Sequence, residues 1–118
     1  MIIKGVVIHG AELGRRLGFP TANLDATNID IANGVYLSRV SFGGRSYKAM
    51  TNIGCRPSVD GESRLLEAHI FDYEGDLYER QIEVELLSKL RDEQRFDSIS
   101  ELQEQLKRDA ERCYSMEW

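Results

Sequence analysis

The residues best suited to chemistry lie in one short run, Gly14–Asn23, which reads GRRLGFPTAN. Two glycines bracket a pair of arginines, and a proline ends the loop. Residues i and i+2 of a strand point to the same face, so we expect Thr21 and Asn23 to present two neutral oxygens side by side. Such oxygens suit a hard cation such as Mg²⁺, and a glycine-rich backbone with arginine suits phosphate. The run therefore indicates a metal–nucleotide site, although it matches neither a P-loop nor the HRD and DFG motifs of protein kinases.

The same run also has a purely structural interpretation. Pro-Thr-x-Asn occurs as a turn in which both side chains bond nearby backbone groups. Glycines beside arginines are common in flexible surface loops, where the charges are simply solvated. The residues of this run, taken alone, leave both interpretations open.

A second candidate is a carboxylate inside an apolar run. Alternation over Leu65–Phe71 places Glu67 on one face of a strand and Leu66, Ala68 and Ile70 on the other. Burying a carboxylate without a partner is costly, so an exterior position or a buried salt bridge is one interpretation. The other is a general base that takes the proton from an attacking hydroxyl, as phosphoryl transfer requires of an orienting carboxylate.

The elements that must position these residues are mostly strands. Runs rich in β-branched and alternating residues predict about six of them, at residues 1–8, 21–24, 34–42, 45–54, 65–72 and 81–87. Gly43-Gly44 between two of these runs predicts a hairpin. Pro57 and Gly61 predict a loop over residues 56–63.

The last third of the chain changes to helical spacing. Ser98 and Glu101 fit a capping box, and an apolar stripe recurs at three- and four-residue intervals, formed by Ile99, Leu102, Leu106, Ala110 and Cys113. Sequential short strands with tight turns favour a mainly β fold, because a barrel removes open sheet edges. We therefore predict a small closed antiparallel β-barrel with a C-terminal α-helix packed on it.

Length and composition bound the class of protein. The chain has 118 residues, of which 42% are hydrophobic and 30% charged, which fits one domain over residues 1–118. The formal net charge of −5 argues against a general nucleic-acid binder, since these usually carry a basic face. The sequence contains no apolar run of membrane-spanning length and no signal peptide, and Cys55 and Cys113 lack zinc-site spacing. We therefore expect a reduced, cytoplasmic protein that binds neither nucleic acid nor membrane.

The motifs resemble those of the riboflavin kinase family, whose signature is a G-x-P-T-A-N run. The resemblance spans nearly the whole chain in the family's order, through Gly5–Gly10, Gly14–Asn23, Asn52–Gly54 with Pro57, Leu66–His69, Asp76–Tyr78, Leu90–Glu93 and Phe96–Ser98. It implies a closed barrel of about six strands with a C-terminal helix and ligand loops at its rim. It also implies an enzyme, a kinase that uses ATP and Mg²⁺ to phosphorylate the 5′-hydroxyl of riboflavin, giving FMN and ADP.

The resemblance also implies roles for individual residues. Glu67 would be the catalytic base, and Thr21 and Asn23 would hold Mg²⁺. The nucleotide would lie against a glycine flap and an adenosine pocket, formed by Gly10, Arg15, Gly18, Thr21, Ile70, Asp72 and Tyr78. A lone histidine in a strand is more often structural, so we assign no catalytic role to His69.

The flavin ring would lie under the segment that follows residue 90. There the resemblance implies flavin contacts from Arg91, Gln94 and Phe96, and an arginine with an aromatic ring suits a flat heteroaromatic system. Without the resemblance, this segment is an exposed charged connector. Asp92 stands where relatives usually have proline, which removes a backbone restraint from the loop.

Two further interpretations remain at this level. A barrel that binds flavin or nucleotide without catalysis is the alternative to a kinase, although Glu67, Thr21 and Asn23 together speak against it. In many bacteria the family's kinase domain is fused behind an FMN adenylyltransferase domain, so this chain is compatible with a part of such a bifunctional enzyme.

Overall fold

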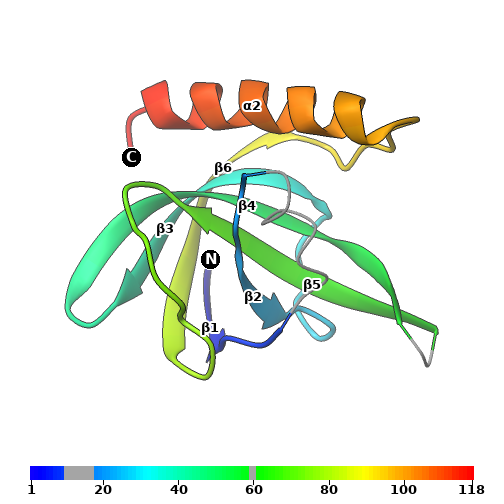
Figure 1. Ribbon diagram of the computed structural model, residues 1–118. Coiled ribbons are helices and arrows are strands. Elements are labelled where there is room, and N and C mark those ends of the chain that lie inside the picture. Colours follow the sequence, from blue (N-terminus) through cyan, green and yellow to red (C-terminus); the bar gives the residue numbers. More distant parts are fainter. Residues whose placement is uncertain (10–17, 59–60) are drawn as a thin grey trace.

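The computed structural model describes residues 1–9, 18–58 and 61–118 (Figure 1). In these residues the chain forms six strands and one helix: β1 Ile2–Val6, β2 Ala22–Asp25, β3 Gly34–Phe42, β4 Arg45–Ser58, β5 Gly61–Ile70, β6 Gln81–Arg91 and α2 Ile99–Ser115. The phosphate-flap prediction for Gly10 and Arg15 stays untested, because residues 10–17 lie outside the described residues.

The strands form one antiparallel sheet that curves into a nearly closed barrel. Their order is β1-β6-β3-β4-β5-β2, and each neighbouring pair is antiparallel. The two outer strands approach each other where the Ile8 amide donates a hydrogen bond to the Asn23 carbonyl at 2.8 Å. This contact shortens the open edges that a sheet would otherwise leave. The mainly β prediction is confirmed.

Alternation along the strands fills the barrel with apolar side chains. The most completely buried members of this inner core include Leu24, Val40, Ile53, Leu66, Ile82 and Val84. The outer face of the sheet has a second core, which consists of Val35, Leu37, Met50, Phe71, Leu90 and Cys113. Helix α2 covers this second core and lies across the top of the barrel in Figure 1. The outer face is therefore apolar where α2 covers it.

Both ends of α2 are held by side chains. Ser98 is the N-cap and accepts a hydrogen bond from the Glu101 amide at 3.2 Å, as the capping box predicted. At the other end, the Lys48 ammonium donates to the carbonyls of Tyr114 and Met116, where a cation also complements the helix dipole. The predicted apolar stripe needs one correction, because Ile99 in the first turn is 62% exposed and does not pack on the barrel.

The predicted loop over residues 56–63 is wrong where the structure describes it, since residues 56–58 and 61–63 belong to strands. Strand β4 continues to Ser58 and pairs with β5 as far as the Ser58–Gly61 pair. Strand β3 pairs with β4 only as far as Ile53, so among the described residues the outer part of this hairpin pairs as two strands without β3. Proline lacks a backbone N–H. It is tolerated in an edge strand, because no neighbouring strand there would accept a hydrogen bond from that N–H. Pro57 therefore marks an edge and not a loop.

Strands β1 and β2 differ from their predicted bounds by one or two residues, and two other boundaries bear on the site. Strand β6 runs to Arg91 and not to residue 87, so Arg91 is the last residue of a strand and the connector to α2 comprises residues 92–98. Strand β5 ends at Ile70 and a turn begins at Phe71, in which Asp72 has a φ of 57°. The helix in the described part of the chain is too short and too polar to cross a membrane.

Candidate active site

Thr21 and Asn23 lie side by side, as their spacing predicted. Ala22 and Leu24, on either side of Asn23, belong to the inner core. The side chain of Asn23 therefore projects to the outer face of the sheet, where it is only 6% exposed. The Thr21 hydroxyl donates a hydrogen bond to Asn23 Oδ1 at 2.9 Å. The two side chains bond each other, which differs from the alternative in which both satisfy local backbone groups.

This oxygen pair fits a small hard cation. Neighbouring ligands around an octahedral Mg²⁺, each about 2.1 Å from the ion, lie about 3 Å apart, which is close to the 2.9 Å between Thr21 Oγ1 and Asn23 Oδ1. In the described part of the chain, no group of three or more His, Cys, Asp and Glu side chains is placed to share a metal. A cation held here would therefore combine the neutral oxygens of the protein with oxygens of a phosphate ligand, as Mg²⁺ commonly does.

Glu67 lies on the outer face of the middle of β5. The predicted alternation is confirmed, because Leu66, Ala68 and Ile70 are buried in the inner core while Glu67 is half-buried on the opposite face. In the strand register, Glu67 pairs with Asn23 on one side and with Asn52 on the other. The carboxylate therefore stands next to the oxygen pair of β2.

The strand register extends this arrangement into a row across five strands. The pairs are Asn23 with Glu67, Glu67 with Asn52, Asn52 with Val35, and Val35 with Arg91. Directly paired residues project from the same face of a sheet, so these five side chains form what we call the outer-face row. Neighbouring strands lie about 4.8 Å apart, which puts Glu67 and Arg91 about 14 Å apart along the sheet. The row joins neutral oxygens, a carboxylate and a guanidinium on one surface.

A cleft of about 500 Å³ opens at the rim of the barrel beside Thr21. Three predicted nucleotide residues line it, namely Thr21, Ile70 and Tyr78. The ring of His9 stacks on that of Tyr78, with centroids 3.8 Å apart and an interplanar angle of 29°. An apolar floor with aromatic rings at its edge can take a flat heteroaromatic group.

Asp72 and Gly18 need separate comment. The Asp72 carboxylate accepts a hydrogen bond from the Tyr114 hydroxyl of α2 at 3.1 Å, and this bond raises the pKa of Tyr114. Asp72 is thus tied to the helix and is not among the residues described as lining the cleft. Gly18 has φ of 87°, a left-handed conformation in which any other residue is strained. Backbone conformation and not crowding favours glycine here, since no described residue beyond its chain neighbours lies within 4 Å of the position of a Cβ.

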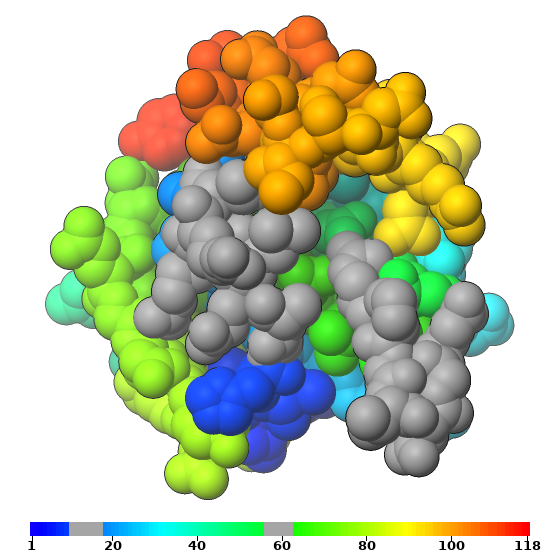
Figure 2. All heavy atoms as spheres, turned by 45° about the vertical axis from the view of Figure 1, so that its right-hand side comes forward, coloured from blue at the N-terminus to red at the C-terminus, as the bar shows by residue number. Residues whose placement is uncertain are grey.

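The predicted flavin residues gather where the connector meets α2. Gln94 and Phe96 line a shallow groove of about 460 Å³ together with helix residues that include Gln105 and Arg108. The Arg91 guanidinium lies 5.9 Å from the centroid of the Phe96 ring. In Figure 2 the residues that follow β5, in light green, and the helix with its connector, in orange and yellow, flank one face of the molecule. The segment that follows β5 and the segment that precedes α2 therefore lie at different borders of this face.

Asp92, which stands where relatives usually have proline, has two partners at the start of the connector. Lys89 Nζ lies 2.6 Å from Asp92 Oδ1, and the Arg91 guanidinium donates to the Asp92 carbonyl at 3.0 Å. The hydrogen bond between Lys89 and Asp92 raises the pKa of the lysine and lowers that of the aspartate. Because Asp92 is exposed, this pair contributes little stability, but it defines where the connector begins.

His69 has a structural environment. Its Nδ1 lies 2.9 Å from the Pro20 carbonyl oxygen, and its ring packs edge-on against Phe19 and Phe71. These contacts hold the segment before β2 against β5. We therefore continue to assign no catalytic role to His69.

Sequence reasoning missed three residues at this site. Asn52 belongs to the site because it pairs with Glu67 in the strand register, and His9 belongs to it because its ring stacks on Tyr78. Asp109 is a buried carboxylate that binds Arg91. A signal existed for Asp109, since it lies between Leu106 and Cys113 at helical spacing, on the face that packs against the sheet. Asn52 offered no such signal, because its neighbours come from distant parts of the chain.

Residues 1–116 of the chain match the model of the riboflavin kinase family, Flavokinase. The bifunctional riboflavin kinase/FMN adenylyltransferase of Escherichia coli (strain K12) is 46% identical over 109 residues, covering 91% of this chain and 35% of the relative. The RNA-binding riboflavin kinase RibR of Bacillus subtilis (strain 168) is 42% identical, covering 92% of this chain and 47% of the relative. The chain thus spans less than half the length of these curated relatives.

Solved structures share the same architecture. One, described as a macrolide-efflux protein from Streptococcus pneumoniae, matches with a TM-score of 0.85 and 38% identity, covering 98% of this chain and 39% of that chain. The riboflavin kinase of Trypanosoma brucei matches with a TM-score of 0.65 and 23% identity, covering 98% of this chain and 78% of that chain. The second match bears on the fold alone.

Proposed function

This chain belongs to the riboflavin kinase family, and we propose that it transfers the γ-phosphoryl group of ATP directly to the 5′-hydroxyl of riboflavin, giving FMN and ADP. The observation that supports this most is the outer-face row. It brings a carboxylate next to an oxygen pair suited to Mg²⁺ and places a guanidinium farther along the same surface. Phosphoryl transfer depends on such alignment and charge neutralisation more than on covalent chemistry.

Glu67 is the proposed general base. It would accept the proton of the 5′-hydroxyl and orient that oxygen toward the γ-phosphorus, so that attack and departure are in line. The proton passes to the Glu67 carboxylate, the new P–O bond forms on the flavin side, and the bond to ADP breaks. Its position suits this role, because the strand register pairs Glu67 with Asn23, one of the proposed ligands of Mg²⁺.

Thr21 and Asn23 are the proposed protein ligands of Mg²⁺. When bound, the ion would neutralise charge on the phosphate oxygens. The two side chains would keep the terminal phosphate beside Glu67, since Asn23 and Glu67 are paired residues. Gly10 and Arg15 are the proposed phosphate flap, with Gly18 at its end.

The cleft beside Thr21 is the proposed adenosine site, and the connector is the proposed flavin site. Ile70 and Tyr78 would contact the adenine ring. Asp72 stays a proposed nucleotide residue that Tyr114 holds in place. Arg91, Gln94 and Phe96 would contact the isoalloxazine ring. The ribityl chain would then extend from the connector toward Glu67.

Product analysis tests this function. The purified chain incubated with riboflavin, ATP and Mg²⁺ should form FMN and ADP in equal amounts, and EDTA should stop the reaction. Flavin binding without FMN under varied metals and nucleotides would instead support the alternative, a non-catalytic binding barrel. Because one relative is described as RNA-binding, the same preparation should also be titrated with RNA. From the net charge of −5, we expect no binding at physiological salt.

A further inference from the structure

Asp109 is a charged group buried between helix and sheet. It lies in the third turn of α2 and is only 4% exposed. Burying a carboxylate is costly unless it is paired and fully hydrogen-bonded. The Asp109 carboxylate therefore needs a partner whose charge and hydrogen bonds offset the cost of its burial.

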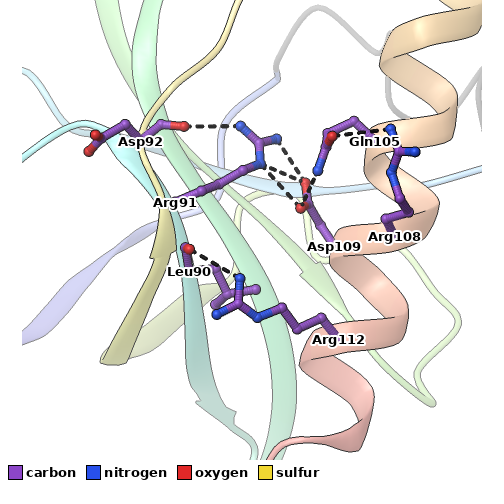
Figure 3. Close-up of polar contacts among 7 residues, drawn as sticks. All are labelled: Leu90, Arg91, Asp92, Gln105, Arg108, Asp109 and Arg112. Carbon is purple, nitrogen blue, oxygen red and sulfur yellow. Dashed lines mark hydrogen bonds and ion pairs between the residues drawn. The ribbon is translucent and has the colours of Figure 1, made fainter.

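Arg91 and Gln105 supply that partner set (Figure 3). Arg91 Nε donates to both oxygens of Asp109 at 3.2 and 3.0 Å, and Arg91 Nη2 donates to Oδ2 at 2.7 Å. Gln105 Nε2 donates to Oδ1 at 2.9 Å from one helical turn earlier. This two-pronged geometry fixes the plane of the guanidinium as well as its position.

The other side of the same guanidinium holds the connector. Arg91 Nη1 donates to the Asp92 carbonyl at 3.0 Å, and the Arg91 Cζ atom lies 5.9 Å from the centroid of the Phe96 ring. A guanidinium has five N–H donors, so it can hold Asp109 and Asp92 and still offer a hydrogen bond to a ligand. One side chain thus links α2, the end of β6 and the aromatic residue of the connector.

We propose that Asp109 is a positioning residue for flavin binding, an inference that rests on the proposed kinase function. It does not touch the substrate. It sets the plane of the Arg91 guanidinium, which in turn sets the start of the connector and the place of Phe96. The surface that receives the isoalloxazine ring is therefore organised from the Arg91–Asp109 pair. In the described part of the chain the partners of this pair, Gln105, Asp92 and Phe96, are not among the residues that line the nucleotide cleft.

The test compares Asp109→Asn with the wild-type chain. The amide keeps the shape of the carboxylate but removes its charge, so Arg91 loses its two-pronged partner. We expect the Kd and KM for riboflavin to rise about tenfold, while the KM for ATP stays within about twofold. Flavin fluorescence titration and initial rates of FMN formation measure both. Glu85→Gln is the matched control, because it breaks an ion pair to Arg39 of 2.6 Å that lies away from the connector, and it should leave riboflavin affinity unchanged.

A double-mutant cycle separates positioning from general support of the fold. If Asp109 acts through Phe96, then Phe96→Ala should cost little further riboflavin affinity in the Asp109→Asn background, although it is costly alone. Equal losses of riboflavin and ATP affinity, additive effects in the cycle, or unchanged riboflavin affinity would each overturn the inference. If Asp109→Asn does not fold, Gln105→Met takes its place in the same cycle with Phe96→Ala, because Gln105 also lines the connector groove. It removes one hydrogen bond and should raise the riboflavin Kd about threefold, and no rise would overturn the inference.

Failure of the inference differs from failure of the proposed function. A wild-type chain that makes FMN, with an Asp109→Asn variant that keeps its riboflavin affinity, overturns the positioning role alone. A wild-type chain that makes no FMN overturns the kinase function itself.

Discussion

Glu67→Gln is the substitution that tests the proposed chemistry at its centre. Gln has nearly the volume of Glu and can still accept a hydrogen bond, but it cannot take a proton from a hydroxyl. The residues paired with position 67 across the strands, Asn23 and Asn52, carry amide side chains, which can hydrogen-bond a carboxamide as well as a carboxylate. We therefore expect the free energy of unfolding to change by less than about 1 kcal/mol and the affinities for both substrates to be kept.

The expected effect falls on kcat. General-base catalysis is typically worth about 10²–10⁴-fold, or about 3–5 kcal/mol in the activation free energy. The loose transition state of phosphoryl transfer needs little proton removal early, which places the loss near the lower end of that range. Initial rates of FMN formation at saturating substrates measure it, beside a thermal melt and titrations with riboflavin and ATP.

The control for this variant is Glu83→Gln. Glu83 is an exposed strand carboxylate that pairs with Lys4 at 3.5 Å, so its substitution should leave kcat unchanged. A folded Glu67→Gln protein that binds both substrates and turns over at the wild-type rate would remove Glu67 from the mechanism. Joint loss of stability and binding would mean that the carboxylate supports the fold.

Three further predictions follow from the geometry of the site. Thr21→Val and Asn23→Leu each remove one of the paired oxygens, so both should abolish turnover while riboflavin binding survives; near-normal rates at saturating Mg²⁺ would contradict the ligand assignment. Phe96→Ala should weaken riboflavin binding more than ATP binding in parallel titrations, whereas equal effects would mean that the connector is only a solvated link. Burial raises the pKa of Cys113 to about 11, so a maleimide at pH 8 should label exposed Cys55 and leave Cys113 unmodified in the folded chain, as mass spectrometry can show. Labelling of both thiols would mean that α2 does not pack as described.

Strands and helix ends were predicted well where the residues that determine them are close together in the sequence. Strand β3 begins at Gly34 and ends at Phe42 as expected, because turn residues bound it on both sides. The cap at Ser98 followed from the spacing to Glu101. The loop signal at Pro57 was misleading, since a proline at the free edge of a ribbon breaks no hydrogen bond. Whether an edge is free depends on where the neighbouring strand ends, which no local pattern reveals.

The same limit applies to the site. The spacing of Thr21 and Asn23 was enough to place their oxygens together, and alternation was enough to put Glu67 on the face opposite the core. The row could not be predicted from residues alone, because it depends on the register between strands far apart in the sequence. The pairing of Arg91 with Asp109 likewise depends on how α2 docks on the sheet.

Transfer of a labelled phosphoryl group tests the central claim most directly. The purified chain should be mixed with riboflavin, Mg²⁺ and ATP labelled in the γ-phosphate, and the flavin, the inorganic phosphate and the protein should be separated after a single turnover. Direct transfer along the outer-face row predicts that the label appears in FMN, in an amount equal to the ADP formed, with none on the protein. Label that stays in ATP, leaves as inorganic phosphate or attaches to the protein would contradict the account.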